Sequence, residues 1–187
     1  MKKSLLRKKL LQETGSYNLE ELQQRSENVA LNLQNLPLYK QADCVMFYYP
    51  LKREVNLLGA IREALKQKRV CFPVIDLKEG DLIPYEVKDL AKDLIKGPLE
   101  IMQPDREKTR EVELQNIDVV IVPGLAFDRK KNRLGRGKGF YDRFLKRLDK
   151  KTRRVGVAFD FQLIPSVPTH PPGDEKVDLV VTESACI

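Results

Sequence analysis

Residues 123–147 read PGLAFDRKKNRLGRGKGFYDRFLKR, and the strand, loop and helix predicted around them set the pattern for the rest of the chain. The apolar run 117–122 predicts a buried strand that ends at Pro123. In the loop 133–139, three cationic residues alternate with three glycines. Apolar residues then recur at helical spacing, which predicts a helix that begins near Gly139: Phe140, Phe144 and Leu148. This arrangement favours phosphate, because glycine lets backbone N–H groups approach an anion and the helix N-terminus adds positive partial charge.

The positive charge of the chain is concentrated in the same region. The chain has 34 Lys and Arg against 27 Asp and Glu, a net charge of +7. Residues 129–154 contain 13 Lys and Arg and two Asp, a local charge of +11, so the remainder carries −4. A focused patch raises the local concentration of an anionic ligand. It suits a small phosphorylated ligand and also a nucleic acid, so charge alone does not decide between them.

Length and composition indicate one soluble domain over residues 1–187. Hydrophobic residues make up 42% of the chain, enough for a core, and no apolar run approaches the roughly 20 residues of a membrane span. The apolar stretch 4–6 is too short for a signal peptide. The three cysteines lack metal-type spacing and are expected to be reduced, which indicates a cytoplasmic protein: Cys44, Cys71 and Cys186.

Helices and strands alternate along the chain. Helices are predicted over 2–13, over 19–36 until Pro37, and over 55–65. Strands are predicted over 44–49, 70–74, 117–122, 154–159 and 177–182, with one small strand at 82–87 inside the weakly patterned region 76–115. This alternation predicts an α/β, single-domain layered fold with a mostly parallel central sheet flanked by helices.

The motif PGLAFD…RLGRGKGFYDRFL resembles the signature of the 5-formyltetrahydrofolate cyclo-ligase (5,10-methenyltetrahydrofolate synthetase) family. The resemblance covers nearly all 187 residues, because three further blocks occur in the family's order. They are Lys3-x-x-x-Arg7, Phe47-Tyr48-Tyr49…Glu54 and Gly156-x-Ala158…Gln162…Asp174-x-x-x-Asp178. The resemblance implies ATP-driven cyclisation of 5-formyltetrahydrofolate to 5,10-methenyltetrahydrofolate, with release of ADP and phosphate and use of Mg²⁺.

This reaction is consistent with the residue types present. An N-formyl amide is a poor electrophile, and phosphorylation of its oxygen creates a leaving group before the neighbouring nitrogen closes the ring. The protein must hold triphosphate, metal and formyl oxygen in line and stabilise the transferring phosphoryl group. Such a task needs cations and backbone donors more than acid–base groups, which fits a chain with one histidine. Arg136 and Lys138 are therefore the expected catalytic residues.

The nucleotide site implied by the resemblance combines the N-terminal helix with the glycine loop. The expected ATP-binding residues are Lys3, Ser4, Arg7, Arg133, Leu134, Gly135, Arg136, Gly137, Lys138, Gly139, Phe140 and Tyr141. Two alternatives stay open: a solvated amphipathic helix for Lys3 and Arg7, and a basic surface loop or RNA contact for 133–141. Phe140 stands where family members often carry Tyr, so an apolar or stacking role remains but a hydroxyl role does not.

The folate site implied by the resemblance lies between the strand end near Glu54 and the glycine-rich loop, whereas ATP lies over the N-terminal helix and the basic loop. Its expected residues are Arg7, Tyr49, Glu54, Arg136 and Phe140. A carboxylate such as Glu54, beyond a strand end, can accept paired hydrogen bonds from an amino-pyrimidine edge. The alternative is an ordinary charge at the start of a helix. Tyr48 and Tyr49 alternate, so one is expected in the core and one in the pocket. For Gln162, folate contact and turn capping remain equal alternatives.

The expected Mg²⁺ partners are Asp142 and Asp174, since Mg²⁺ prefers oxygen ligands and two carboxylates suffice beside phosphate oxygens. Asp142 alternatively supplies favourable charge in the first turn of a helix, and Asp178 competes with Asp174. His170 is expected to be a loop residue without catalytic duty.

We therefore expect a monomeric, cytoplasmic ligase whose partners are 5-formyltetrahydrofolate and ATP, with no nucleic acid or membrane partner. Two other functions are retained as alternatives. One is an RNA-binding module that uses the patch 129–154, although this patch lacks the interleaved exposed aromatic residues of single-strand binders. The other is a sugar-phosphate isomerase on a similar sheet, which would need a general base and no nucleotide.

Overall fold

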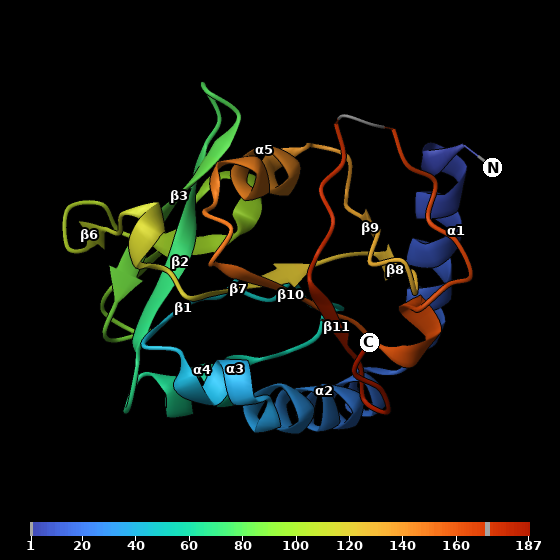
Figure 1. Cartoon of the computed structure of the whole chain (residues 1–187), viewed down its shortest axis with the longest axis horizontal. Coiled ribbons are helices and arrows are strands. Elements are labelled where there is room, and N and C mark those ends of the chain that lie inside the picture. Colours follow the sequence, from blue (N-terminus) through green and yellow to red (C-terminus); the bar gives the residue numbers. More distant parts are fainter. Residues whose placement is uncertain (1, 171–172) are drawn as a thin grey trace.

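A seven-stranded sheet runs through the middle of the molecule in the order β11-β10-β7-β1-β2-β3-β6 (Figure 1). The structure, a computed structural model, describes residues 2–170 and 173–187. Strands β11, β10, β7, β1 and β2 are parallel, whereas β3 and β6 are antiparallel at one edge. The strands are β1 Cys44–Met46, β2 Arg69–Asp76, β3 Asp81–Val87, β6 Arg110–Glu111, β7 Val119–Pro123, β10 Arg153–Val157 and β11 Leu179–Val181. The predicted α/β fold with a mostly parallel sheet is confirmed.

Helices cover both faces of the sheet: α2, α3 and α4 lie on one side, and α5 lies on the other (Figure 1). They are α2 Leu19–Asn35, α3 Pro37–Gln41, α4 Leu58–Ala64 and α5 Phe140–Arg147. Strand β7 contributes to both cores, because alternate side chains point to opposite faces. Val119 and Ile121 pack in the cluster that contains α2 and α4, and Val120 and Val122 pack in the cluster that contains Phe144 of α5.

Helix α1, Lys3–Ser16, packs against a small hairpin rather than against the middle of the sheet. The hairpin joins β8, Ala126–Phe127, to β9, Arg133–Leu134. Leu6 and Leu10, one turn apart, are buried against it, as the predicted helix requires. The hairpin itself was not predicted, because the sequence indicated only a loop there. None of the helices in residues 2–170 and 173–187 is long and apolar enough to cross a membrane.

Other differences from the prediction concern short elements. Region 76–115 contains the predicted strand, seen as β3, and also β4 Leu94–Lys96, β5 Met102–Pro104, β6, and the 3₁₀-helices η1 Pro98–Glu100 and η2 Leu114–Asn116. Elements of two or three residues are too short for a periodic signal. Earlier in the chain, β1 is shorter than the predicted strand 44–49 and α4 is shorter than the predicted helix 55–65. Pro37 ends α2 as predicted and also begins α3, where a proline fits the first turn.

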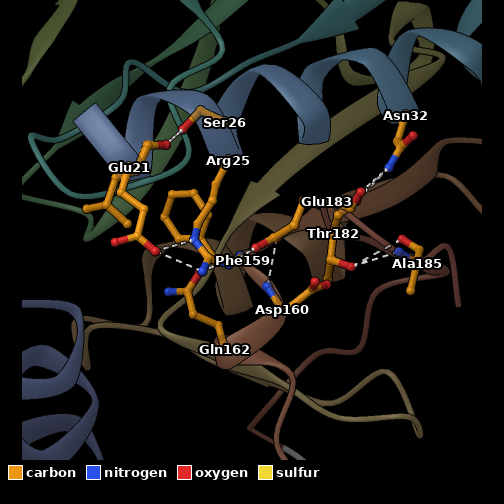
Figure 2. A network of polar contacts seen from close by, with 11 residues as sticks. Glu21, Arg25, Ser26, Asn32, Phe159, Asp160, Gln162, Thr182, Glu183 and Ala185 are labelled. Atoms are coloured by element: carbon orange, nitrogen blue, oxygen red, sulfur yellow. Dashed lines mark hydrogen bonds and ion pairs between the residues drawn. The ribbon is translucent and has the colours of Figure 1, made fainter. Parts of the chain in front are cut away.

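A polar network joins α2 to the C-terminal turn and to the 3₁₀-helix η3, Asp160–Gln162 (Figure 2). Arg25 of α2 donates a 2.6 Å hydrogen bond to Glu183, and the other carboxylate oxygen of Glu183 accepts from Asp160 N at 2.8 Å. Asn32 of α2 donates to two carbonyls of the same turn, Thr182 and Glu183. The network therefore holds the chain end against α2 and orients η3, which follows strand β10.

Asp128 organises the turn that leads from β8 back into β9. Its carboxylate is buried and accepts hydrogen bonds from the backbone N–H groups of Lys130 (2.9 Å), Asn132 (3.0 Å) and Val167 (2.9 Å). Burial by itself would raise the pKa of this carboxyl. The bonds from Val167 and Asn132 outweigh burial, so the pKa of Asp128 lies below its ordinary value of 3.8.

Replacement of Asp128 by Asn should lower the free energy of unfolding at neutral pH by at least about 2 kcal/mol, because buried donors lose their charged acceptor. The pKa of Asp128 is lower in the folded protein than in the unfolded chain. The wild-type contribution is therefore complete above pH 3.8 and is lost as the pH falls through the folded value. Urea unfolding of both proteins across this range should show converging stabilities in acid. Asp149→Asn, which removes an exposed carboxylate, is the control; an equal loss in the control would contradict this role of Asp128.

Candidate functional site

A cavity of about 530 Å³ opens where the chain leaves the carboxyl ends of β1 and β7. Polar and cationic groups line one part of it, from α1, the loop after β9 and the start of α5. Apolar side chains from β2, β3 and the β4–β5 hairpin line another part: Pro73, Ile75, Leu82, Leu99, Ile101 and Met102. Such a cavity can accept a ligand with an anionic portion and a flat apolar portion at the same time.

The loop between β9 and α5, residues 135–139, has a backbone that requires glycine. Gly137 and Gly139 have φ angles of +101° and +73°, a region that L side chains rarely adopt. A Cβ on Gly135 would lie 2.8 Å from the Arg133 side chain. We call residues 135–139 the glycine loop. It follows a short strand and precedes the N-terminus of α5, so its position matches the predicted anion-binding arrangement.

Helix α1 directs two of its cations into the cavity. Arg7 Nε donates a 2.9 Å hydrogen bond to Gly135 O, and Lys3 forms an ion pair with Asp174. Both side chains line the cavity, which argues against a merely solvated helix face. Ser4 is exposed and does not line the cavity, so the structure does not bring it to the other predicted nucleotide residues.

Arg133, predicted to bind the nucleotide phosphates, is engaged largely by other groups of the protein. Its side chain is 4% exposed, and Nη2 donates to Asp142 Oδ1 at 2.8 Å. Its other Nη group donates to Pro123 O at 3.3 Å. The guanidinium is therefore committed to the protein, although Arg133 still lines the cavity. Leu134, beside it, is buried in the apolar cluster under α1.

Tyr141, on the first turn of α5, presents a buried hydroxyl with no hydrogen-bond partner among the described residues. Arg133 Nε is likewise buried and without a partner in that part of the chain. Burial raises the pKa of the Tyr141 hydroxyl well above its ordinary value, so this group stays protonated at neutral pH. Tyr141 and Phe140 both line the cavity, next to the glycine loop.

Glu54 and Arg136 form an ion pair across the cavity. Glu54 Oε1 accepts from Arg136 Nε at 3.0 Å and lies 3.0 Å from Arg136 Nη2, and Glu54 Oε2 accepts from Leu51 N at 3.1 Å. The Glu54 side chain is 15% exposed and that of Arg136 is 44% exposed. The loop after β1 and the glycine loop, distant in sequence, are thus brought together by a charge pair.

The two tyrosines that follow β1 differ in burial, but both line the cavity and both pack on the same apolar cluster, so the predicted division between core and pocket is only partial. Tyr48 is buried in the core, and its hydroxyl donates to Val55 O at 2.6 Å. Tyr49 is half-buried and lines the cavity. Burial raises the pKa of Tyr48 well above its ordinary value, which keeps the hydroxyl available as a donor.

Asp142 and Asp174 both line the cavity, and each is paired with a cation. Asp142 Oδ1 accepts from Arg133, and Asp174 Oδ2 accepts from Lys3 and from His170 N. The second oxygen of each carboxylate accepts no hydrogen bond from the described residues. Burial alone would raise the pKa of Asp174, but the bonds from Lys3 and His170 outweigh it and lower that pKa. The carboxylate of Asp174 is therefore ionised at neutral pH, and Asp142 and Asp174 each offer one oxygen to a ligand.

The positions of three further residues bear on the roles that the sequence analysis discussed for them. Asp178 lies outside the cavity and accepts from Arg154 N at 2.8 Å. Gln162 is buried, accepts from Phe159 N (2.9 Å, Figure 2) and donates to Leu125 O (3.2 Å), so it caps a turn and does not line the cavity. His170 is an exposed loop residue at the cavity rim whose backbone contacts Asp174.

The sequence analysis missed several cavity residues. Arg143 and Lys146 of α5 line the cavity, as do Leu99, Ile101 and Met102 of the β4–β5 hairpin. The two cations sit one turn apart on the helix that follows the glycine loop, a spacing that could have indicated a shared face. The hairpin carries no such signal, because its strands have three residues each.

Besides Arg136, three of the thirteen cations of the predicted patch 129–154 pair with carboxylates of the described residues. Arg147 pairs with Asp81 at 2.9 Å, Arg154 lies 3.4 Å from Glu175, and Arg133 is buried against Asp142. The net charge of +11 in this stretch therefore overstates the free positive surface that it presents. This reduction weakens the case for an extended RNA-binding face.

Known proteins resemble this chain over most of its length. A model of the 5-formyltetrahydrofolate cyclo-ligase family matches residues 1–183. The 5-formyltetrahydrofolate cyclo-ligase of Mus musculus is 31% identical over 156 residues, which are 79% of this chain and 76% of the mouse protein. The Escherichia coli K12 protein of the same name is 30% identical over 168 residues, 88% of this chain and 91% of that protein.

Two solved structures share the fold. The NMR structure of Aquifex aeolicus 5,10-methenyltetrahydrofolate synthetase superposes with a TM-score of 0.87 and 38% identity, over 100% of this chain and 92% of that one. The Mycoplasma pneumoniae 5,10-methenyltetrahydrofolate synthetase superposes with a TM-score of 0.78 and 25% identity, over 98% and 99% of the two chains. The family match over almost the whole sequence and the shared fold lead to one conclusion: this chain belongs to the 5-formyltetrahydrofolate cyclo-ligase family and is a ligase.

Proposed function

We infer that the protein couples ATP hydrolysis to the cyclisation of 5-formyltetrahydrofolate, which yields 5,10-methenyltetrahydrofolate, ADP and phosphate. The observation that carries this proposal is the Glu54–Arg136 pair, which joins an acidic and apolar part of one cavity to its glycine loop. A nucleotide in one part and a folate in the other would meet at this pair. The cavity therefore suits transfer of a phosphoryl group between two bound ligands.

The nucleotide phosphates are assigned to the side formed by α1 and the glycine loop. Arg7, Arg136 and Lys138 supply positive charge there, and Gly137 and Gly139 allow close approach of backbone N–H groups. Lys3 and Tyr141 complete this side, and the unpartnered Tyr141 hydroxyl is a donor that a phosphate oxygen would satisfy. Arg133 contributes by orienting Asp142 instead of by contacting phosphate.

The folate is assigned to the side formed by the loop after β1 and the β2–β5 region. Glu54 would accept N–H groups of the amino-pyrimidine edge, after exchanging its bonds with Arg136 for bonds with the ligand. Tyr49 and Phe140 would contact the flat ring system, and Ile75, Leu82 and Met102 are part of its apolar surroundings.

The chemistry follows from this placement. The formyl oxygen attacks the γ-phosphorus, and ADP leaves. The neighbouring folate nitrogen then attacks the formyl carbon and loses its proton, while the carbon–oxygen bond breaks and phosphate leaves. Arg136 and Lys138 would stabilise the negative charge that spreads over the transferring phosphoryl group. Their exposure to the cavity, in contrast to the buried Arg133, leaves them available for this role.

Asp142 and Asp174 fit Mg²⁺ because both carboxylates line the cavity and each has one oxygen that accepts no hydrogen bond from the described residues. Mg²⁺ is commonly bound through one or two carboxylates together with phosphate oxygens and water. The ion would neutralise charge on the phosphates. Residues 2–170 and 173–187 contain no cluster of three acidic, histidine or cysteine ligands, which such a site does not require.

The proposal includes a cytoplasmic monomer with small-molecule partners and without nucleic acid or membrane partners. Its support is the engagement of patch cations within the protein and the burial of two free cysteines, Cys44 and Cys71. The isomerase alternative is set aside, because the chain belongs to a ligase family.

The purified protein with ATP, Mg²⁺ and 5-formyltetrahydrofolate should form the methenyl chromophore, with one ADP released per turnover. Absorbance and a coupled ADP assay, followed in the same sample, measure both products. Omission of nucleotide is the control. Chromophore formation at the full rate without ATP would overturn the proposed function.

Replacement of Glu54 by Gln should weaken folate binding by about 1.5–3 kcal/mol, the range for charge-assisted hydrogen bonds. Nucleotide affinity should change little, because Arg136 remains in place. Titration calorimetry with each ligand separately measures the two effects, and Glu107→Gln, at an exposed position outside the cavity, is the matched control. An equal loss of nucleotide affinity would show that Glu54 has a different role.

Replacement of Gly137 by Ala should lower kcat/KM for ATP at least about tenfold, or 1.4 kcal/mol. The φ angle of +101° disfavours any side chain, and the new Cβ would lie 3.2 Å from the Arg7 guanidinium. Gly59→Ala is the control, since that glycine lies in α4 with nothing within 4 Å of a Cβ. Near-normal turnover of Gly137→Ala in a kinetic and thermal-unfolding series would place the nucleotide elsewhere.

A further inference from the structure

Arg143 of α5 lines the cavity but forms no ion pair with the carboxylates of the described residues. Its donors are directed to the backbone instead. Nε donates to Gly80 O at 2.5 Å, and Nη2 donates to Lys138 O at 3.0 Å. The guanidinium also lies 5.6 Å from the centre of the Phe140 ring. One side chain therefore connects the turn between β2 and β3 to the glycine loop.

Two glycines create the space that this guanidinium occupies. A Cβ on Gly80 would lie 3.0 Å from Arg143 Nη2, and a Cβ on Gly139 would lie 2.7 Å from Nη1. Both glycines also have positive φ angles, +67° and +73°. Each therefore favours glycine for two independent reasons, the backbone conformation and the contact with Arg143.

Apart from the ion pair of Arg136 with Glu54, the glycine loop has few other attachments among the described residues. The described bonds to carbonyls of residues 135–138 come from two arginines: Arg7 donates to Gly135 O, and Arg143 donates to Lys138 O. The turn held by the other end of Arg143 joins the strands that carry Ile75 and Leu82 into the apolar part of the cavity. Figure 1 shows this β2–β3 ribbon beside α5. Arg143 thus bonds both to the glycine loop and to the turn that joins the strands of the apolar part.

We propose that Arg143 is a positioning residue for the cyclo-ligase reaction. Its side chain holds the glycine loop in its phosphate-binding conformation and at a fixed position relative to strands β2 and β3. The inference depends on the proposed function, because that function assigns phosphates to this loop. Without Arg143 the loop adopts other conformations, and the apparent affinity for ATP falls with the fraction that remains competent. A small displacement of the phosphate donor also slows the chemical step.

Kinetics of Arg143→Met and Arg143→Lys test the positioning role against a simple charge effect. Both variants should raise KM for ATP at least about fivefold and lower kcat, since an ammonium group cannot make the two divergent bonds of the guanidinium. Lys150→Met, which removes an exposed cation outside the cavity, should behave as wild type. Full rescue by Lys would overturn the proposal in favour of charge alone.

Gly80→Ala gives a second, remote test, because Gly80 does not line the cavity and its new methyl group would press on Arg143. It should reduce kcat/KM for ATP in the wild type. In the Arg143→Met background its effect should be smaller, because the contact with the guanidinium is gone and only the backbone strain at a φ angle of +67° remains. Additive losses would show that Gly80 acts independently and would contradict the proposal.

Hydrogen exchange by mass spectrometry of the ligand-free proteins separates this inference from the proposed function. Peptides covering residues 133–140 should exchange faster in Arg143→Met and Gly80→Ala than in wild type and Lys150→Met, at temperatures well below unfolding of each variant. Unchanged exchange together with unchanged kinetics would overturn the role of Arg143. If the wild type forms no ADP with folate, the proposed function fails, while the exchange data still decide whether Arg143 holds the loop.

Discussion

The ion pair between Arg133 and Asp142 is the interaction on which the site depends. Arg133 ends the short strand β9 and Asp142 lies on the first turn of α5, so the pair closes the glycine loop at its base. Removing one member of a buried pair costs about 3–5 kcal/mol, because the other charge is left without a partner. The ion pair therefore fixes both ends of the loop through a contact that solvent reaches poorly. The residues between them can then be flexible glycines without loss of the loop's position.

Paired charges are a general property of this cavity. Its three carboxylates, Glu54, Asp142 and Asp174, each contact a cation from a different element of the fold. Ligand-free protein consequently avoids unpaired buried charge, which is costly. A bound nucleotide or folate would exchange partners with these pairs, so its net binding energy is a difference between two sets of charge-assisted bonds. The more exposed pair, Glu54 with Arg136, is the one that exchanges at least cost.

Much of the fold could be predicted from local patterns. The apolar run before Pro123, the helical spacing of Phe144 and the paired leucines of α1 specify elements that the structure contains. Prediction was poorer for region 76–115 and for the β8–β9 hairpin. The strands missed there have two or three residues and are stabilised by pairing with other strands, for which a local sequence window carries little information.

The sequence by itself determined which elements form around the glycine loop, because periodicity, proline positions and the steric freedom of glycine act within a few residues. It also identified the family through four ordered motifs. Only the tertiary structure decided the partners of the charges. Arg133 and Arg136 are three residues apart and look equivalent in sequence, yet one is buried against Asp142 and the other faces Glu54 across the cavity. Burial and long-range proximity assign their roles, and both arise only when the chain is folded.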